Sequence, residues 1–372
     1  MKIIYLSNFN EMSGFSEAAR GYHKILKNIV TPYNLIVEGT RVSNIRNGIE
    51  KIPDEKYCIL WHANPLVMIN ATRGMFNTQN AKFIADLFKN SKANIAINAW
   101  ETSHLPTEHI KTYRQLGTKA VIVPSEYNKN IYKKHIKTYK VHHYIEKSKV
   151  KNVSFPLVKN KKYFLSISQW NYRKNFSDLL YSFFLEFFEE DIYLILKTYK
   201  DHVDEGRNFI TQKIKSIKEK VEFSKKSESK CKIILITNYI TEEKKHFLLQ
   251  NCVAYCGTPL SEGFGIGFAE AAIYNKPVVA PNRGGQCDFL DPKYLFETYE
   301  DHYRGPLGYG YTPDMFVNYP VIKSIRNKLR SALCMQFEPT NSLQTRGEIY
   351  STFMDIFEQE RLLTYEKIGN NK

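Results

Sequence analysis

The sequence has no apolar run of the roughly 20 residues that a helix needs to cross a lipid bilayer. Its first residues, MKIIYLSNFNEMSG, contain too short an apolar core for a secretory signal peptide, so we expect a buried strand there. It also has no long low-complexity segment, and no internal repeat beyond an α/β alternation in both halves. The sequence therefore predicts a protein of the cytoplasm rather than a membrane-spanning or secreted one.

Cysteine is scarce, with six residues scattered over 372 positions. Cys252 and Cys256 are closely spaced, but the sequence lacks the companion pair that a zinc site would need. Free thiols buried in a reducing compartment explain this pattern better. We therefore expect no cysteine-bound metal.

Hydrophobic residues make up 43% of the chain and aromatic residues 14%, which indicates packed globular structure rather than disorder. A chain of 372 residues exceeds one ordinary hydrophobic core, and two domains are the default expectation. The segment Asn152–Lys162, which contains Pro156, separates two series of short apolar runs. We place the break between the domains near residue 156.

Short apolar runs alternate with helical patterns in both halves, which is typical of parallel α/β sheets. Ser16 and Ser125 are the expected N-caps of two helices. The expected strands are Lys2–Ser7, Tyr57–His62, Ile95–Trp100, Ala120–Pro124, Tyr163–Ile167, Ile192–Lys197, Ile233–Ile236, Val253–Tyr255 and Val278–Ala280. The expected helices begin at Ser16 and near Thr107, and cover Asn80–Lys89, Glu126–Tyr139, Asp178–Phe188, Thr241–Gln250, Phe268–Tyr274 and Arg346–Ile368.

One stretch, Thr258–Leu290, combines a glycine-rich loop, a helix start and a buried strand, as at the ligand-binding end of a parallel α/β sheet. Glycines let the backbone approach a bound group, and the free N–H groups of a helix start favour phosphate. Glu262 and Glu270 flank the loop eight positions apart. Carboxylates beside such a loop are suited to accept hydrogen bonds from sugar hydroxyls.

The motif SEGFG at 261–265, followed by Glu270, Ala-Ala and Lys-Pro-Val-Val, resembles the signature of retaining glycosyltransferases of the GT-B fold, in the large family 4. The resemblance implies that Glu270 binds the ribose of a nucleotide-sugar and that Glu262 lies near the donor sugar. It also implies that Gly263, Phe264 and Gly265 line the donor pocket. The simpler interpretation of the same residues is a loop and helix cap with two solvated glutamates.

Two further segments resemble the parts of that family that bind the donor diphosphate. SGFSEAARGY is similar to the first loop, which assigns a phosphate contact to Gly14 and Phe15. In SQWNYRKN, Lys174 falls on the family's lysine, whereas Gln169 stands where the arginine is usual. Arg173 is then the candidate for the missing cation. Two cations facing two phosphates suit a leaving nucleoside diphosphate.

Polar residues at the ends of two other strands extend the list of candidates. Glu101 and His104 lie in WETSHLPTEHI, directly after the strand Ile95–Trp100. This stretch is similar to one in a bacterial, phage and large-virus subset of family 4. Many members of the family carry a histidine here that contacts the donor sugar, and both residues are kept as candidates for that role. Lys197, at a strand end, is either a further donor contact or a surface lysine.

The resemblance implies two doubly wound Rossmann-like domains facing across a cleft. The first, residues 1–155, would take the acceptor, and the second, residues 156–345, would hold a UDP- or GDP-sugar. Residues 346–372 would form a helix that crosses back to the first domain. The implied enzyme is a hexosyl- or pentosyltransferase that retains anomeric configuration. An Asp-x-Asp motif is absent, and the fold normally works without a metal or a tightly bound cofactor.

Charge is unevenly distributed over the chain, whose net charge is +15. Residues 1–155 carry 23 Lys and Arg against 11 Asp and Glu, a net charge of +12. Such an excess suggests an anionic partner, although a general enrichment in lysine would also produce it. A lysine-rich helix at 126–139 could also lie on a membrane interface.

The acceptor is the open part of the assignment. A glycan or lipid-linked glycan would place the enzyme at the inner membrane face. Hydroxymethylated pyrimidines of DNA, modified in a host cytoplasm if the source is viral, are the alternative. A non-catalytic nucleotide-sugar scaffold and a sugar-nucleotide epimerase complete the alternatives.

Overall fold

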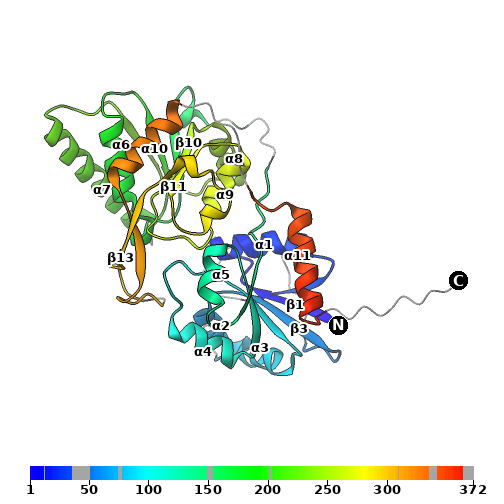
Figure 1. Ribbon diagram of the computed structural model, residues 1–372. Coiled ribbons are helices and arrows are strands. Elements are labelled where there is room, and N and C mark those ends of the chain that lie inside the picture. The colour runs from blue at the N-terminus through cyan, green and yellow to red at the C-terminus, as the bar shows by residue number, and fades with distance from the viewer. Residues whose placement is uncertain are drawn as a thin grey trace.

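The computed structural model describes residues 1–11, 13–35, 51–73, 78–148, 153, 155–200, 203–308, 310–334 and 342–362, with the backbone alone at 78–80 and 203–205. Two α/β domains lie one against the other (Figure 1). The chain completes the second domain and then returns to the first through α11 (Arg346–Gln359), the red helix in Figure 1. Within these described ranges, no helix is long and apolar enough to cross a membrane.

The first domain is built on a six-stranded sheet, ordered β2-β1-β3-β4-β5-β6, in which every neighbouring pair is parallel. Its central strands are buried along their length, because helices cover both faces of a parallel sheet. The strands are β1 (Lys2–Ser7), β2 (Val30–Asn34), β3 (Tyr57–His62), β4 (Asn94–Ile97), β5 (Thr118–Val123) and β6 (Lys137–Lys140). The helices are α1 (Gly14–Leu26), α2 (Pro65–Thr72), α3 (Thr78–Asn90), α4 (Thr107–Gln115) and α5 (Glu126–Tyr132).

The second domain has a parallel sheet of the same size, ordered β12-β11-β10-β7-β8-β9. The chain builds outward from β7 to β9 and then crosses back to β10, so the strand order reverses between β7 and β10. Ligands of doubly wound sheets bind at this point, beyond the carboxyl ends of the strands. The strands are β7 (Tyr163–Ile167), β8 (Tyr193–Lys197), β9 (Lys232–Ile236), β10 (Ala254–Cys256), β11 (Val278–Pro281) and β12 (Leu295–Phe296). The helices are α6 (Phe176–Glu186), α7 (Val203–Lys225), α8 (Glu242–Asn251), α9 (Ile266–Ile273) and α10 (Ile322–Cys334).

This architecture confirms the predicted fold class, although the predictions for the end of α5 and for the N-cap of α1 are wrong. The helix expected over Glu126–Tyr139 ends at Tyr132, and the lysine-rich remainder forms strand β6, paired with β5. Thr138 and Tyr139 favour a strand, and the edge of a parallel sheet is available to them. The N-cap of α1 is Ser13, whose hydroxyl accepts a hydrogen bond from the backbone N–H of Ser16. Ser125 caps α5 as predicted.

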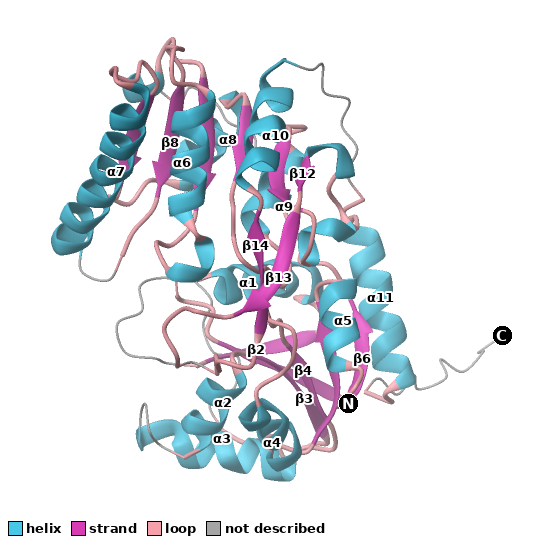
Figure 2. Cartoon of the chain, turned by 60° about the vertical axis from the view of Figure 1, so that its left-hand side comes forward, coloured by secondary structure: helices cyan, strands magenta, loops and turns pink. Residues whose placement is uncertain are grey.

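A two-stranded antiparallel hairpin, which the sequence pattern does not indicate, extends from the second domain. It consists of β13 (Thr298–His302) and β14 (Phe316–Pro320), with Tyr299 directly opposite Tyr319. Figure 2 shows the hairpin running from the second domain toward the first. At its tip, the backbone N–H of Ser103 donates to the carbonyl of Phe316 at 3.2 Å. We call residues 298–308 and 310–320 the strap.

Helix α11 attaches the end of the described chain to the first domain, as predicted. A capping box joins Thr345 and Glu348 at its start, which satisfies backbone donors in the first turn. Phe353 is fully buried, and its ring meets that of Tyr22 edge to face at 5.1 Å. The helix ends at Gln359, with Glu360 as its C-cap, so the prediction that it continues without a break to Ile368 is wrong. Residues 363–368 lie outside the described residues.

Replacing Phe353 by Ala should reduce the free energy of unfolding by about 3–5 kcal/mol, because a large aromatic side chain leaves a closed core. Urea denaturation followed by circular dichroism measures this loss. Tyr350→Ala is the matched control, since Tyr350 lies on the same helix and is 41% exposed. That control should change stability by less than about 0.5 kcal/mol. Equal effects of the two substitutions would contradict the docking of α11.

Candidate functional site

The loop between β10 and α9 lies where the two domains meet. Gly265 has a φ of +88°, and a Cβ there would come within 2.6 Å of the Phe268 ring, so the loop requires glycine. Gly263 packs against the first domain, where an added Cβ would lie 3.1 Å from the carbonyl oxygen of Trp100. The Ser125 hydroxyl donates to the carbonyl of Gly263 at 2.6 Å. The predicted donor loop is therefore held by contacts from both domains.

Four charged side chains, contributed by both domains, meet beside this loop. Arg173 Nη1 lies 3.2 Å from Glu262 Oε1, and Arg173 Nη2 lies 3.4 Å from Glu101 Oε1. Lys174 Nζ also bonds Glu262. The Arg173 guanidinium donates further to the carbonyl of Ser261 at 2.7 Å. Four of the predicted catalytic residues thus form one cluster, with equal numbers of cations and carboxylates.

Burial and charge act against each other within the cluster. Burial favours the neutral form of Glu262, but the charges of Lys174 and Arg173 outweigh it and lower the pKa of this carboxyl. Burial lowers the pKa of Lys174 despite the neighbouring carboxylate. For Arg173, burial is outweighed by Glu101 and Glu262, which raise its pKa. The neighbouring charges therefore favour the ionised forms of Glu262 and Arg173, whereas burial favours the neutral form of Lys174.

Glu270 lies apart from that cluster, on α9, and it is buried. Its carboxylate accepts a hydrogen bond from Lys245 of α8 at 2.7 Å. Lys245 also pairs with Glu242 at 2.8 Å and with Glu17 of the first domain at 3.3 Å. Three carboxylates thus share one ammonium group. Burial, together with the charge of Glu17, raises the pKa of Glu270 to about 8.

The predicted phosphate loop after β1 faces the start of α9. A Cβ on Gly14 would lie 3.6 Å from the side chain of Ile266. The ring of Phe15 meets His62 at 5.8 Å, His62 stacks on His143 at 6.3 Å, and His143 meets Phe264 at 4.9 Å. Burial lowers the pKa of His62 to about 3, so its ring is neutral. The two glycine loops thus border one layer of rings, of which His62, His143 and Phe264 are buried.

Two of the predicted site residues lie outside these clusters. His104 is 39% exposed at its side chain and pairs with Asp314 of the strap at 3.1 Å. Glu101, the alternative to His104, is the residue that joins the charge cluster. Lys197 ends β8, where burial lowers its pKa and its ammonium lies 5.9 Å from the ring of Tyr199. The described residues include no group of three or more side chains that could hold a metal ion.

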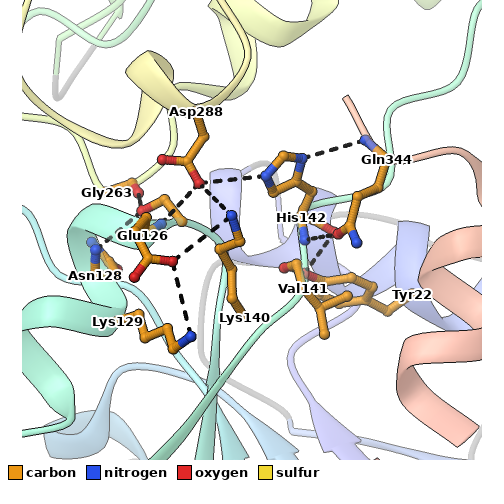
Figure 3. Close-up of polar contacts among 11 residues, drawn as sticks. Tyr22, Glu126, Asn128, Lys129, Lys140, Val141, His142, Gly263, Asp288 and Gln344 are labelled. Atoms are coloured by element: carbon orange, nitrogen blue, oxygen red, sulfur yellow. Dashed lines mark hydrogen bonds and ion pairs between the residues drawn. The ribbon is translucent and has the colours of Figure 1, made fainter. Parts of the chain in front are cut away.

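A second contact between the domains centres on Asp288 (Figure 3). Its carboxylate accepts from the backbone N–H of Glu126 at 2.8 Å and from Lys140 Nζ at 3.1 Å. His142 Nε2 lies 3.5 Å away from the same oxygen, and His142 is bonded in turn to Gln344. Although burial opposes ionisation, these partners lower the pKa of Asp288. The carboxylate holds α5 and the end of β6 against the second domain.

Three residues of these contacts are absent from the sequence prediction. Lys245, Asp288 and Tyr311 acquire their roles through partners that are distant along the chain. Tyr311, for example, donates from its hydroxyl to Glu101 Oε2 at 3.2 Å, across 210 positions. The glycine and tyrosine-rich run 303–311 was the available signal for Tyr311. Lys245 and Asp288 carry no local pattern that distinguishes them from surface residues.

Comparison with known proteins agrees with this geometry. Residues 148–302 match the family model described as "Glycosyl transferases group 1". Over 164 residues the chain is 30% identical to "Alpha-1,3/1,6-mannosyltransferase ALG2" of Dictyostelium discoideum, a match that covers 41% of this chain and 37% of that relative. The chain thus matches well under half the length of this curated relative.

Solved structures resemble the whole chain. The crystal structure of Anabaena Alr3699/HepE in complex with UDP-glucose has a TM-score of 0.56 and 13% identity, covering 98% of this chain and all of that one. A structure titled "Trehalose-6-phosphate from E. coli bound with UDP-2-fluoro glucose" has a TM-score of 0.54 and 12% identity, covering 97% and 96%. The likeness to these two structures is one of fold. The match to the group 1 glycosyltransferase model is confined to residues 148–302, which include the glycine loop and the segment that carries Arg173 and Lys174.

The raised pKa of Glu270 predicts a stability that depends on pH. Between its ordinary value of 4.5 and about 8, the native state holds a proton that the unfolded state has lost. The contribution of Glu270 to the free energy of unfolding is therefore full at the acidic end of this window and falls as the pH rises through it. Glu270→Gln should flatten this dependence in urea titrations run from pH of about 5 to about 9. Parallel curves for the two proteins would show that Glu270 has an ordinary pKa.

Removing the carboxylate of Asp288 should weaken the contact between the domains. Asp288→Ala leaves Lys140 and the backbone N–H of Glu126 without their acceptor, which should cost about 1–3 kcal/mol. Small-angle scattering should then give a larger radius of gyration. Asp291→Ala serves as the control, since the Asp291 carboxylate receives the backbone N–H of Lys293 within its own turn. An unchanged radius of gyration in the Asp288 variant would contradict the role assigned to this residue.

Proposed function

We propose that the protein is a retaining, family 4-like glycosyltransferase that moves a sugar from a UDP- or GDP-sugar to a hydroxyl of a glycan or lipid-linked glycan. The observation that carries this proposal is the cluster of Arg173, Lys174, Glu262 and Glu101 beside the glycine loop. It lies at the carboxyl edge of the second sheet, near the reversal of strand order. An enzyme of this architecture binds its nucleotide at this position, beyond the carboxyl ends of the strands where their order reverses.

The residues divide between donor binding and stabilisation of the leaving group. Glu270 would accept hydrogen bonds from the ribose hydroxyls, and the backbone of Gly14 and Phe15 would contact the diphosphate. Glu262 would bind hydroxyls of the donor sugar. Lys174 would exchange its bond to Glu262 for the diphosphate, because a doubly charged group competes well for a buried ammonium.

Chemistry in this site would depend on charge stabilisation. As the bond between the sugar carbon and the diphosphate oxygen breaks, negative charge grows on the leaving diphosphate, and Lys174 and Arg173 lie where they can offset it. The acceptor oxygen then bonds to that carbon on the face that the diphosphate leaves. Because the new bond forms on that same face, the product keeps the donor's configuration. The proton of the acceptor hydroxyl passes to a phosphate oxygen. No step in this scheme requires a metal ion.

Two observations bear on the acceptor class, the name of the curated relative and the charge of the first domain. The curated relative is named as a mannosyltransferase, which favours a glycan. The excess charge of +12 in residues 1–155 keeps hydroxymethylated DNA as the second candidate. Transfer assays with oligosaccharide and DNA acceptors over a salt series separate the two, because DNA binding weakens steeply with salt.

Donor binding is tested by thermal shift with UDP-, GDP-, ADP- and TDP-sugars. A ligand at about a hundred times its dissociation constant adds about 2.7 kcal/mol of stability. One nucleotide class should raise the melting temperature of the wild type and leave that of Glu270→Ala almost unchanged. A donor shift of equal size in both proteins would exclude Glu270 from the donor site.

Catalysis is tested at Lys174. Lys174→Ala should lower kcat by about 10²–10³, the loss seen when one charge-stabilising donor is removed from an active site. Lys215→Ala is the control for charge, because the Lys215 side chain is 75% exposed on α7 and pairs with Glu219 of the same helix. The same loss in both variants would point to net charge rather than to the position of Lys174. Full activity of Lys174→Ala would overturn the assigned mechanism.

A further inference from the structure

A row of aromatic side chains crosses the strap beside the charge cluster. Trp100 stacks on Tyr311 at 5.3 Å, and Tyr311 stacks on Tyr303 at 5.0 Å. Tyr303 meets Tyr172 edge to face at 5.6 Å. The row therefore begins in the first domain, passes through the strap and reaches the loop that carries Arg173 and Lys174.

The outer part of the row is open to solvent. The Tyr172 hydroxyl lies 3.3 Å from that of Tyr319, which stacks on Tyr299 at 5.9 Å as a cross-strand pair. Tyr172 is 40% exposed and Tyr299 is 54% exposed. Large aromatic rings grouped on a surface commonly mark a binding site. We call Tyr172, Tyr299 and Tyr319 the tyrosine platform.

The surroundings of the platform restrict what it can bind. Arg304 lies over the ring of Tyr319 at 5.5 Å and pairs with Asp301. Arg283 pairs with Glu300 at 3.6 Å, so both arginines at the hairpin are matched by acids. A neutralised surface offers little attraction to phosphate-rich DNA or to anionic lipid. Flat rings edged by hydroxyls instead suit a ligand that has apolar C–H faces and hydroxyl groups.

The row also contacts the charge cluster, where the transfer reaction is proposed to occur. The Tyr311 hydroxyl donates to Glu101, and Glu101 pairs with Arg173. Tyr172 precedes Arg173 in the same short turn, η2 (Tyr172–Lys174). A ligand on the platform would thus lie next to the segment that holds both candidate phosphate-binding cations. A glycan bound there could extend its terminal hydroxyl toward the donor.

We propose that the tyrosine platform is the acceptor subsite and that it binds a neutral oligosaccharide by stacking sugar rings on Tyr172 and Tyr299. This inference rests on the proposed glycosyltransferase function and names its acceptor class. The acceptor would then be held by residues of the second domain. The excess of positive charge in residues 1–155, in contrast, favours an acceptor held by the first domain. The lysine-rich surface of the first domain is not needed for acceptor recognition.

The test measures binding to an immobilised array of neutral oligosaccharides, followed by saturation-transfer NMR with the glycans retained. Tyr172→Ala/Tyr299→Ala should weaken glycan binding by about ten-fold, the size expected when two ring contacts are lost. Tyr172→Phe/Tyr299→Phe keeps both rings and should retain most of the binding. Phe223→Ala removes an aromatic ring that is 89% exposed on α7, and it should bind glycans as the wild type does.

The outcomes separate the platform from the proposed function. Nucleoside diphosphate release from donor by the wild type, with water as acceptor, tests the glycosyltransferase function alone. If that release occurs, equal glycan binding by the double Ala variant and the wild type would overturn the platform. Absence of glycan binding by the wild type, or retention on duplex DNA or phosphatidylglycerol vesicles that depends on the two tyrosines, would overturn it as well. Thermal melts of each variant identify a loss of binding that is caused by misfolding.

Discussion

The guanidinium of Arg173 joins the two domains through charge, since it contacts Glu101 of the first and Glu262 of the second. Its side chain is only 15% exposed, so neither carboxylate can be removed without leaving a poorly solvated cation. The glycine loop, the strap and the loop after β4 all meet around this group. The relative positions of these loops are therefore coupled, because a movement of one loop changes the ion pairs of Arg173 that hold the others.

Parallel topology explains why these loops come together. In each sheet all strands run in one direction, so the segments that follow them emerge at a single edge. Glycine at 263 then allows close contact with the backbone of Trp100, where a side chain would keep the two loops apart. The fold thus supplies the common edge, and a few small residues let the two edges approach.

Much of this arrangement could be predicted from sequence, because short apolar runs, N-caps and the Glu-x7-Glu spacing are local signals. The fold class and most of the strands followed from them. The segment of β6 was predicted as helix because apolar residues placed among lysines over a short stretch fit both the helical and the strand period of hydrophobicity. In the candidate site, Glu262 and Lys174 were predicted by motif and Arg173 as a nearby replacement for the missing arginine, and the three side chains meet. Lys245 and Asp288 were not predicted, since their roles depend on tertiary contacts that join distant segments.

The return of α11 to the first domain has a consequence for the order in which the protein is made. Tyr22, near the start of the chain, is covered by Phe353, near the end of its described part. Domains generally fold as units while the chain emerges from the ribosome, with the N-terminal domain first. Here the first domain has to wait, with part of its core uncovered, until the whole second domain has been synthesised. Of these two domains, the one that is translated first is thus the last to be completed.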